Sequence, residues 1–259
     1  MKKILTIAGS DSSCGAGIQA DIKTISSLGG YGLSVITALT AQNSYGVKKV
    51  QAVDSICVKR QLEAIFDDIK IDAIKIGMVC NKEIIYAIIE YIKQFKNIPV
   101  VLDTIISSSS GYRLLDEGAM EVFVNELMPI CTIATPNIPE AEMLTNSKID
   151  SISDMENRIK NIKAKNVLLK GGHLKGGEAV DILLKNGNEM VHFFQKRVAK
   201  DDVHGTGCTL SSAIAYFLSK EYSLDKAVKL SKDYITEAIK HSFKIGNKTL
   251  YLNHFYGRV

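Results

Sequence analysis

The chain has 259 residues, of which 46% are hydrophobic and 23% charged, as in ordinary globular proteins. Its formal net charge of +4 is too small to indicate a nucleic acid or membrane partner. That length suits one large α/β domain or two small ones, and nothing in the sequence marks a second domain. We therefore expect a single domain spanning residues 1–259, with a small-molecule site.

Nothing at the N-terminus resembles a targeting segment. Met1-Lys2-Lys3 precedes an apolar run that is too short for a signal peptide, and no stretch approaches membrane-spanning length. The cysteines are odd in number and scattered, with no Cys-x-x-Cys pair, which argues against a disulfide framework or a structural zinc site. We expect a cytoplasmic protein. The five cysteines are Cys14, Cys57, Cys80, Cys131 and Cys208.

Short apolar runs alternate with segments whose apolar residues recur at helical spacing. Such alternation predicts a mainly parallel sheet that is covered by helices on both faces. An Asn186-Gly187 turn signal near the middle of the second half predicts an antiparallel hairpin. The expected strands are 4–8, 33–37, 73–78, 99–102, 131–134, 167–170, 180–184 and 189–194, and the expected helices are 18–28, 58–69, 84–92 and 119–127.

The loop after the first strand is rich in small residues, but it is not a dinucleotide fingerprint. Gly9, Gly15 and Gly17 do not fit the spacing G-x-G-x-x-G. Polar and sulfur-containing side chains instead follow several strand ends, where open α/β sheets bind their ligands. We expect these residues to converge on one rim of the sheet: Asp11, Met78, Asp103, Asn137, Glu140 and Lys170.

The segment from His204 to Ser212 contains a glycine turn, Gly205-Thr206-Gly207, that opens a helix with an apolar stripe from Leu210 to Leu218. Unpaired amides and the helix dipole make such a start a natural anion site. Cys208 lies in the first turn, where we expect the pKa of its thiol to fall. These features suit phosphoryl transfer. The alternative is a glycine-flanked helix start with a buried cysteine.

Taken in order, the motifs resemble the hydroxymethylpyrimidine/phosphomethylpyrimidine kinases of thiamine biosynthesis over nearly the whole chain. Each motif alone is weak, but together they are specific. They are Ala8-Gly9-Ser10-Asp11-Ser12-Ser13, Gly15-Ala16-Gly17-Ile18-Gln19-Ala20-Asp21, Thr40-Ala41-Gln42-Asn43, Lys75-Ile76-Gly77-Met78, Leu102-Asp103-Thr104, Thr135-Pro136-Asn137-Ile138-Pro139-Glu140-Ala141-Glu142, Lys170-Gly171-Gly172-His173 and His204-Gly205-Thr206-Gly207-Cys208.

The resemblance implies a ribokinase-like fold, a three-layer α/β/α sandwich with a mainly parallel central sheet. It implies ATP and Mg²⁺ as cofactors, and two successive phosphorylations that convert the pyrimidine to its monophosphate and then its diphosphate. It also implies a homodimer. By the resemblance, Gln42 would bind the aminopyrimidine, while Asp21, Met78 and Gly9 would line its pocket.

On the phosphate side, the resemblance places Cys208 where related sugar kinases have an aspartate base. Main-chain amides of the glycine turn would hold the phosphoryl oxygens, and charge neutralisation would supply most of the rate. The remaining implied roles are nucleotide binding by Asn137, Lys170 and Thr206, phosphoryl contacts by Gly205 and Gly207, and Mg²⁺ binding by Asp103 and Glu140.

Ordinary structural roles stand beside the functional ones on the substrate side. Gln42 is equally a polar loop residue, Met78 by default packs in the core, and Asp21 on a helix is usually a solvated carboxylate. His173 and His204 we treat as structural, because the site already has a candidate base.

The same holds on the phosphate side. Lys170 could simply pair with a carboxylate. Asp103 and Glu140 could be hydrogen-bond acceptors, and for Glu140 a cap on a helix beginning near Pro139 is almost as well supported as a metal role.

Two departures from the family pattern affect the loops. Cys14 stands where the family commonly has glycine, so we expect this loop not to depend on the positive φ that glycine permits. Residues 246–255 replace a more glycine- and proline-rich segment, which leaves their contribution to the nucleotide edge open. The rival functions are a pyridoxal or pyridoxine kinase and a non-catalytic pyrimidine sensor.

Overall fold

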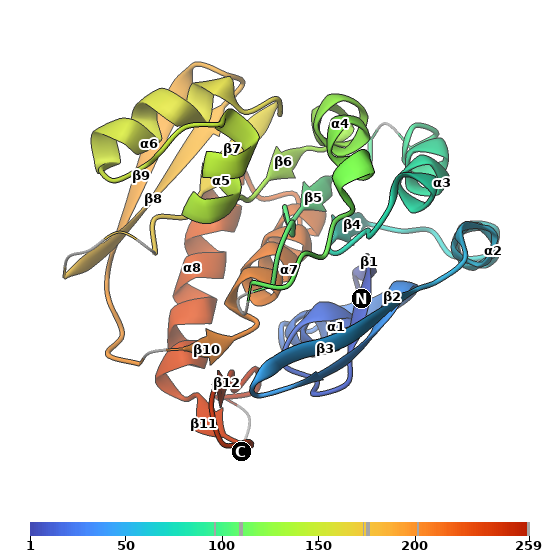
Figure 1. Cartoon of the computed structure of the whole chain (residues 1–259), viewed down its shortest axis with the longest axis horizontal. Coiled ribbons are helices and arrows are strands. Elements are labelled where there is room, and N and C mark those ends of the chain that lie inside the picture. The colour runs from blue at the N-terminus through green and yellow to red at the C-terminus, as the bar shows by residue number, and fades with distance from the viewer. Residues whose placement is uncertain (96, 109–110, 173, 175–176, 201, 258–259) are drawn as a thin grey trace.

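The computed structural model describes residues 1–95, 97–108, 111–172, 174, 177–200 and 202–257. Within them, nine strands form one sheet in the order β3-β2-β1-β4-β5-β6-β7-β8-β9 (Figure 1). The strands are β1 Lys3–Asp11, β2 Tyr31–Asn43, β3 Gly46–Ala52, β4 Ala73–Ile76, β5 Val100–Leu102, β6 Ile133–Ala134, β7 Asn166–Leu169, β8 Glu178–Lys185 and β9 Glu189–Lys196.

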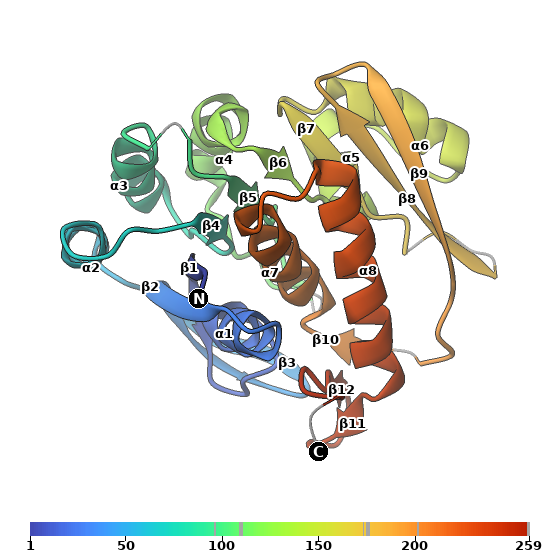
Figure 2. The ribbon, with the colours of Figure 1, turned by 180° about the vertical axis from the view of Figure 1, so that it is seen from behind.

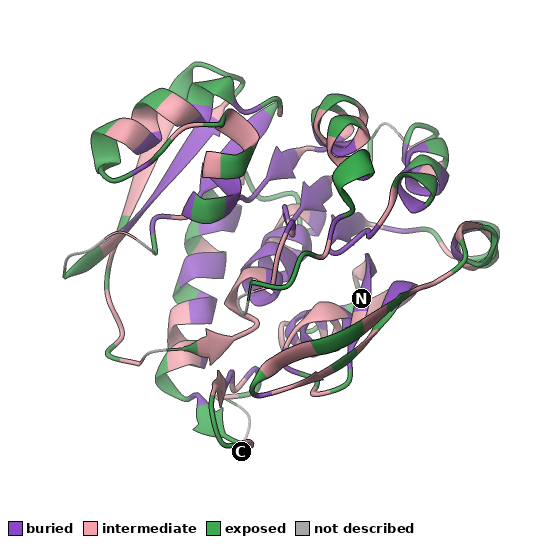
Figure 3. Cartoon of the chain, viewed as in Figure 1, coloured by how far each residue is buried: buried purple, intermediate pink, exposed green. Residues whose placement is uncertain are grey.

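The central strands β2, β1, β4, β5, β6 and β7 run parallel, whereas β3 at one end of the sheet and the β8–β9 hairpin at the other pair antiparallel. The central strands are buried (Figure 3) because helices cover both faces of the sheet. The expected mainly parallel sheet is confirmed. At the β8–β9 turn, Asn186 and Gly187 have φ of 48° and 75°, as the hairpin signal predicts.

The helices divide into two layers. α1 Gly17–Ser27, α7 Thr206–Ser219 and α8 Leu224–Lys240 pack around Ile4, Val101 and Leu168 on one face (Figure 2). The other face is covered by α2 Ser55–Phe66, α3 Lys82–Ile92, α5 Ile138–Thr145, α6 Ile152–Arg158 and the helical turns between Glu117 and Ile130. The molecule is therefore the expected α/β/α sandwich.

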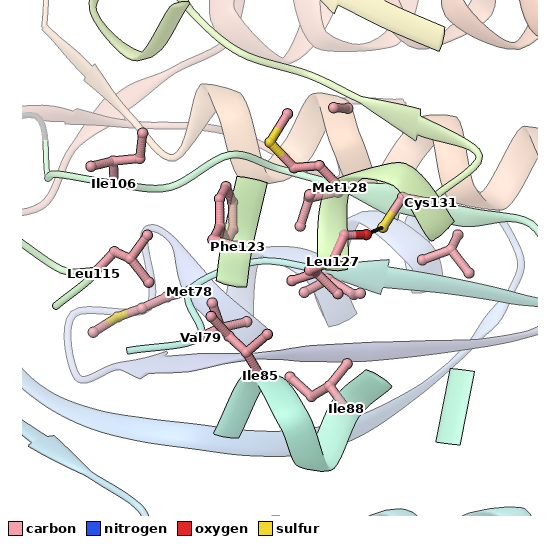
Figure 4. Close-up of a cluster of buried hydrophobic side chains, with 14 of the residues drawn as sticks. Met78, Val79, Ile85, Ile88, Ile106, Leu115, Phe123, Leu127, Met128 and Cys131 are labelled. Atoms are coloured by element: carbon pink, nitrogen blue, oxygen red, sulfur yellow. Dashed lines mark hydrogen bonds between the residues drawn. The ribbon is translucent and has the colours of Figure 1, made fainter. Parts of the chain in front are cut away.

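The core of the second face is aliphatic, with a few sulfur-containing and aromatic side chains (Figure 4). Ile85 and Ile88 of α3 meet Phe123 and Leu127, which are fully buried. Met78 lies at the margin of this cluster and is 5% exposed. The structural alternative for Met78, packing in the core, is thus confirmed.

Three parts of the fold differ from the expected elements. β2 is longer than the expected strand, since it continues through Gln42 and pairs antiparallel with β3. A short turn connects the two strands, because antiparallel neighbours need no crossover helix. The expected helix at 119–127 is a series of short turns, the 3₁₀ turn Glu117–Ala119, the α turn Met120–Val122 and the π turn Phe123–Leu127, followed by the 3₁₀ turn Met128–Ile130. Pro129 lies in that last turn and cannot donate a helical hydrogen bond. Helices α6 and α8 were not expected.

A small second sheet joins the C-terminal segment to the glycine turn. Its order is β10-β12-β11, formed by β10 Val203–His204, β11 Phe243–Lys244 and β12 Leu250–Tyr251. Residues 246–255 therefore hold the entry to α7, and His254 Nε2 lies 3.0 Å from Thr209 Oγ1. Among the described helices, none is long and apolar enough to span a membrane.

Candidate active site

The predicted rim of strand ends is present. Asp11 ends β1, Met78 follows β4, Asp103 follows β5 and Lys170 follows β7. Together with β6, these parallel strands are neighbours in the sheet, in the order β1-β4-β5-β6-β7. Asn137 lies beside Lys170 in an isolated parallel bridge. Parallel strands bring these residues to one edge because they all end on the same side.

The glycine turn begins α7 as expected. Gly205 is the N-cap with φ of 84°, and a Cβ there would lie 1.8 Å from the Gly15 carbonyl oxygen. Only glycine fits this position, on both conformation and space. The first intrahelical bond runs from the Thr209 amide to the Gly205 carbonyl, so the three preceding amides have no acceptor within the helix. Those amides belong to Thr206, Gly207 and Cys208.

Cys208 differs from expectation in its ionisation. Its side chain is 6% exposed, and burial raises the pKa of the thiol to about 12, although nearby Lys75 favours the thiolate. The expected fall in the thiol pKa is therefore wrong. Desolvation of the charged form outweighs the stabilisation that the helix dipole gives the thiolate. The alternative of a buried cysteine is correct for its packing.

A sealed ion pair lies beside Cys208. Lys75 Nζ is 2.8 Å from Asp21 Oδ2, and both side chains are 0% exposed. Asp21 also accepts hydrogen bonds from Thr6 and Ser212. Burial raises the pKa of Asp21, and the attraction of Asp21 keeps the pKa of Lys75 above its usual range despite burial. The alternative of a solvated carboxylate is wrong, since Asp21 faces the interior, and its place in the substrate pocket stays a prediction.

Lys170 makes a second, more accessible ion pair. Its Nζ lies 3.2 Å from Asp103 Oδ1, with 14% of the lysine side chain and 2% of the aspartate exposed. A Cβ built on Gly207 would be 3.4 Å from this Nζ, so the ammonium group adjoins the glycine turn. Burial opposes ionisation of Asp103, but Lys170, Lys75 and a hydrogen bond from Thr135 hold its pKa below the usual range.

Glu140 and Asn137 form a capping box at the start of α5. Asn137 Oδ1 accepts from the Glu140 amide, and Glu140 Oε2 accepts from the Asn137 amide and from Thr104 Oγ1, each at 2.9 Å. The predicted helix cap is confirmed. Burial, joined by the negative charge of Asp103, raises the pKa of Glu140 to about 7 against the attraction of Lys170.

Among the described residues, no three His, Cys, Asp or Glu side chains gather as a metal centre would require. Asp103 and Glu140 are nevertheless buried carboxylates that interact with each other, and carboxylate oxygens are what Mg²⁺ takes beside phosphate oxygens and water. The donor set fits a magnesium ion that arrives with a nucleotide. The nucleotide role of Asn137 and the metal roles of Asp103 and Glu140 remain predictions.

Gln42 lies beside His204, the residue that precedes the glycine turn. Its Nε2 is 2.8 Å from His204 Nε2, and its backbone exchanges hydrogen bonds with Ser12 Oγ at 2.8 and 2.9 Å. Gly9 makes room for Met78, because a Cβ on Gly9 would lie 2.9 Å from the Met78 sulfur. Gln42 and Lys170 thus both adjoin the turn, and their binding roles stay predictions.

Two residues near the site carry interactions that the sequence reasoning did not assign. Lys75 is a lone lysine inside the apolar strand Ala73–Ile76, and that setting was the available signal for a buried ion pair. His204, expected to be structural, contacts both Gln42 and Asp11. His173, also expected to be structural, lies outside the described residues.

The loop at Cys14 adopts the conformation that we did not expect. Cys14 has φ of 60°, so the backbone keeps a left-handed turn although glycine is absent. The Cys14 amide donates to the Asp11 carbonyl at 2.9 Å, and Lys23 Nζ donates to the Cys14 carbonyl at 2.5 Å. These bonds hold a conformation that costs a non-glycine residue about 1–2 kcal/mol.

Known proteins with this sequence pattern are kinases. A family model for phosphomethylpyrimidine kinase matches residues 11–253. The hydroxymethylpyrimidine/phosphomethylpyrimidine kinase of Aquifex aeolicus is 45% identical over 245 residues, which cover 93% of this chain and 96% of that protein. The thiamine biosynthesis bifunctional protein ThiED of Geobacter sulfurreducens is 44% identical over 254 residues, or 97% of this chain and 52% of the relative, so this chain spans about half of that relative's length.

Two solved structures share the fold. The phosphomethylpyrimidine kinase of Clostridium difficile has a TM-score of 0.81 at 48% identity, covering 93% of this chain and all of that one (100%). The ADP complex of Bacillus subtilis pyridoxal kinase has a TM-score of 0.91 at 33% identity, covering 100% and 99%. The fold is therefore ribokinase-like, and the chain belongs to the hydroxymethylpyrimidine/phosphomethylpyrimidine kinase family.

Proposed function

We propose that this chain transfers the γ-phosphoryl group of ATP to 4-amino-5-hydroxymethyl-2-methylpyrimidine, and then phosphorylates the monophosphate to the diphosphate, in thiamine biosynthesis. The observation that carries the proposal is the first turn of α7, where amides without helical acceptors, the Lys170 ammonium group and the Cys208 sulfur adjoin one another. Use of ATP is supported by the ADP complex of the Bacillus subtilis relative.

The phosphate end of the site supplies charge and position. The amides of Thr206, Gly207 and Cys208, together with Lys170, would hold the moving phosphoryl group, whose charge spreads over its outer oxygens in the transition state. Lys170 can leave Asp103 for a phosphate oxygen without leaving its place beside Gly207. Positioning and charge neutralisation would provide most of the rate.

Cys208 would accept the proton of the substrate hydroxymethyl group in the first phosphorylation. Its raised pKa makes the thiol the resting form, so the thiol must first lose its own proton to solvent, and the positive charge of Lys75 favours the thiolate that then accepts the substrate proton. The base therefore contributes a smaller factor, about 10²-fold. In the second step the acceptor is a phosphate oxygen that is already ionised, so that step needs no such base.

Mg²⁺ would be held by Asp103 and Glu140, with phosphate oxygens and water completing its shell. When bound, it would neutralise charge on the nucleotide phosphates. Gln42 would recognise the aminopyrimidine, because an amide offers an adjacent donor and acceptor. Met78 and Gly9 would form a wall of the pocket, since Gly9 leaves room for the Met78 sulfur to lie against its backbone.

A second candidate activity is pyridoxal or pyridoxine phosphorylation. It is favoured by the TM-score of 0.91 with the Bacillus subtilis pyridoxal kinase, which exceeds the 0.81 of the Clostridium difficile enzyme. Sequence identity favours the pyrimidine instead, at 48% against 33%. A non-catalytic pyrimidine sensor is the third candidate, and the presence of Lys170 and Cys208 beside the glycine turn argues against it.

We further propose a single catalytic domain that works as a homodimer in the cytoplasm. One continuous sheet running through the described residues supports the single domain. Exposed apolar side chains on and beside the β2–β3 hairpin, Tyr31, Leu39, Tyr45 and Ile56, suit a subunit interface. The cysteines Cys14, Cys57, Cys80, Cys131 and Cys208 are all free, as in a reducing compartment.

Turnover of three acceptors with Mg-ATP separates the candidates: hydroxymethylpyrimidine, its monophosphate and pyridoxine. We expect both pyrimidines to be phosphorylated and pyridoxine to be a poor substrate. Cys208→Ala should fold normally, lose about 10²-fold in kcat on the alcohol and lose much less on the monophosphate. Cys57→Ala, at an exposed position on α2, is the matched control. Equal losses on both acceptors would exclude Cys208 as the base.

A further inference from the structure

Both carboxylate oxygens of Asp11, at the rim of the sheet, accept several hydrogen bonds. Its Oδ1 accepts from the Ser13 amide and hydroxyl, each at 2.8 Å, and its Oδ2 accepts from the amides of Gly15 and Ala16 at 3.0 and 2.9 Å. His204 Nε2 lies 3.0 Å from the same Oδ2. Asp11 is 2% exposed. Four N–H or O–H donors on two oxygens hold this side chain as a carboxylate.

The ionised Asp11 determines where His204 carries a proton. An unprotonated Nε2 at 3.0 Å would set a lone pair against the carboxylate oxygen, and this is unfavourable in a buried site. Nε2 must therefore bear the hydrogen and donate it. Gly15 packs against the Cδ2 edge of the ring, and the ring of Tyr251 stands at 85° to it with centroids 5.9 Å apart, so the imidazole is held beside Asp11.

A protonated Nε2 in turn determines the orientation of the Gln42 amide. With Gln42 Nε2 at 2.8 Å from His204 Nε2, two donors would face each other. A half-turn of the amide brings Oε1 to this place, where it shares the imidazole N–H with Asp11. The amide nitrogen then lies at the position 3.4 Å from Thr40 Oγ1, which can accept because its own hydrogen goes to the Ser10 carbonyl at 3.0 Å.

We propose that His204 is a positioning residue for substrate recognition, which holds the Gln42 amide with Oε1 toward the imidazole and its NH₂ group toward Thr40. The amide keeps one free hydrogen for an acceptor such as a ring nitrogen, and one free lone pair on Oε1 for an adjacent amino group. The specificity part of this inference rests on the proposed function. It names an aminopyrimidine edge, with its donor and acceptor side by side, as what the oriented amide selects.

The arrangement also connects the two halves of the site. His204 ends β10 and directly precedes Gly205, the N-cap of α7, so the residue that orients Gln42 is bonded to the turn proposed to hold phosphate. The backbone of Gln42 is fixed independently by Ser12. The hydrogen bond from His204 therefore acts on the side chain of Gln42 and not on its backbone.

The proton position can be measured directly on the wild-type chain with ¹⁵N-labelled histidine. Long-range proton–nitrogen spectra distinguish a protonated Nε2 from an unprotonated one, and His204→Gln identifies the signal. We expect a protonated Nε2 at neutral pH, with or without substrate. An Nε2 that lacks its proton would overturn the inference, whether or not the chain proves to be a pyrimidine kinase.

Kinetics test the consequence for recognition. His204→Phe should raise the KM for hydroxymethylpyrimidine about 5- to 10-fold, the effect of one lost hydrogen bond, while the KM for ATP stays within twofold. In a Gln42→Ala background the same change should add less than twofold, because there is no amide left to orient. His204→Gln, whose amide can donate from a similar place, should recover most of the affinity.

The control is His241→Phe, an exposed histidine that hydrogen-bonds its own helix and should change neither KM. If His204→Phe and Gln42→Ala prove additive, His204 does not act through Gln42. If the wild-type chain does not turn over the pyrimidine, the proposed function fails, while the spectra still decide the proton position and the amide orientation.

Discussion

Two lysine–aspartate pairs lie close to the start of α7, and they differ in their access to solvent. Lys75 and Asp21 are both 0% exposed at a separation of 2.8 Å, whereas Lys170 is 14% exposed and lies 3.2 Å from Asp103. Asp21 is also bonded to Thr6 and to Ser212, which lies one turn beyond Cys208 on α7. The first pair is enclosed on every side, and the second borders the glycine turn.

The difference in solvent access indicates that one lysine–aspartate pair is structural and that the other serves the proposed reaction. A sealed ion pair has no solvent to replace either partner, so it fixes the packing of α1, β4 and α7 and sets the field at Cys208. A pair at the rim can exchange its carboxylate for a phosphate oxygen. We expect mutations in the sealed pair to affect stability first, and those in the rim pair to affect activity first.

The largest expected effect comes from breaking the sealed pair. Lys75→Met leaves Asp21 in the interior without its cationic partner, which typically costs about 3–5 kcal/mol in free energy of unfolding. Denaturant titration measures this loss. Lys75→Met with Asp21→Asn should recover much of it, since the amide can still bond Thr6 and Ser212, and Lys59→Met at an exposed ion pair should cost less than about 1 kcal/mol. A small loss for Lys75→Met alone would contradict the distinction.

The rim pair should respond mainly in catalysis. Lys170→Met removes a cation from the proposed phosphoryl site, and we expect kcat/KM to fall about 10²–10³-fold. Its free energy of unfolding should fall by less than that of Lys75→Met, because solvent reaches the rim. Kinetics and denaturation of the same preparation give both numbers. Lys163→Met, at an exposed lysine bonded to Asn125, serves as the control. An equal or larger stability loss for Lys170→Met would reverse our assignment.

The smallest expected effect is a pH dependence of stability that arises beside the rim pair. Burial raises the pKa of Glu140, beside the rim pair, from 4.5 to about 7. The folded chain then binds this proton more tightly than the unfolded chain, so its contribution to stability is complete below pH 4.5 and is lost as the pH rises toward 7. Between these values, the stability of wild type relative to Glu140→Gln should fall by about 1–3 kcal/mol.

Denaturant titrations at several pH values measure that slope. The matched control is Glu142→Gln on the same helix, because a hydrogen bond from the Ile149 amide lowers the pKa of Glu142 and removes any slope above pH 4.5. A wild-type stability that runs parallel to that of Glu140→Gln throughout this range would show that Glu140 is ionised in the fold.

Local pattern was sufficient wherever the sequence repeats with the period of its element. The buried strand at Ile4–Ala8, the helix after Gly205 and the Asn186-Gly187 hairpin follow from apolar spacing and from φ preferences, which depend on neighbouring residues only. Parallel strands then bring Asp103 and Lys170 to one edge by topology alone. These parts of the fold and of the candidate site could be predicted from the sequence.

What only the tertiary structure decided is which groups lose their water and which partners they meet. From the sequence, Asp21 is expected at the surface, but in the fold it lies 2.8 Å from Lys75, which is far along the chain. Cys208 is expected to be an activated thiol, but burial raises its pKa to about 12. His204 likewise gains its contact with Gln42 only through the fold. Desolvation and long-range pairing depend on distant segments, so a local pattern such as a lone lysine in an apolar strand can indicate burial but does not identify the partner.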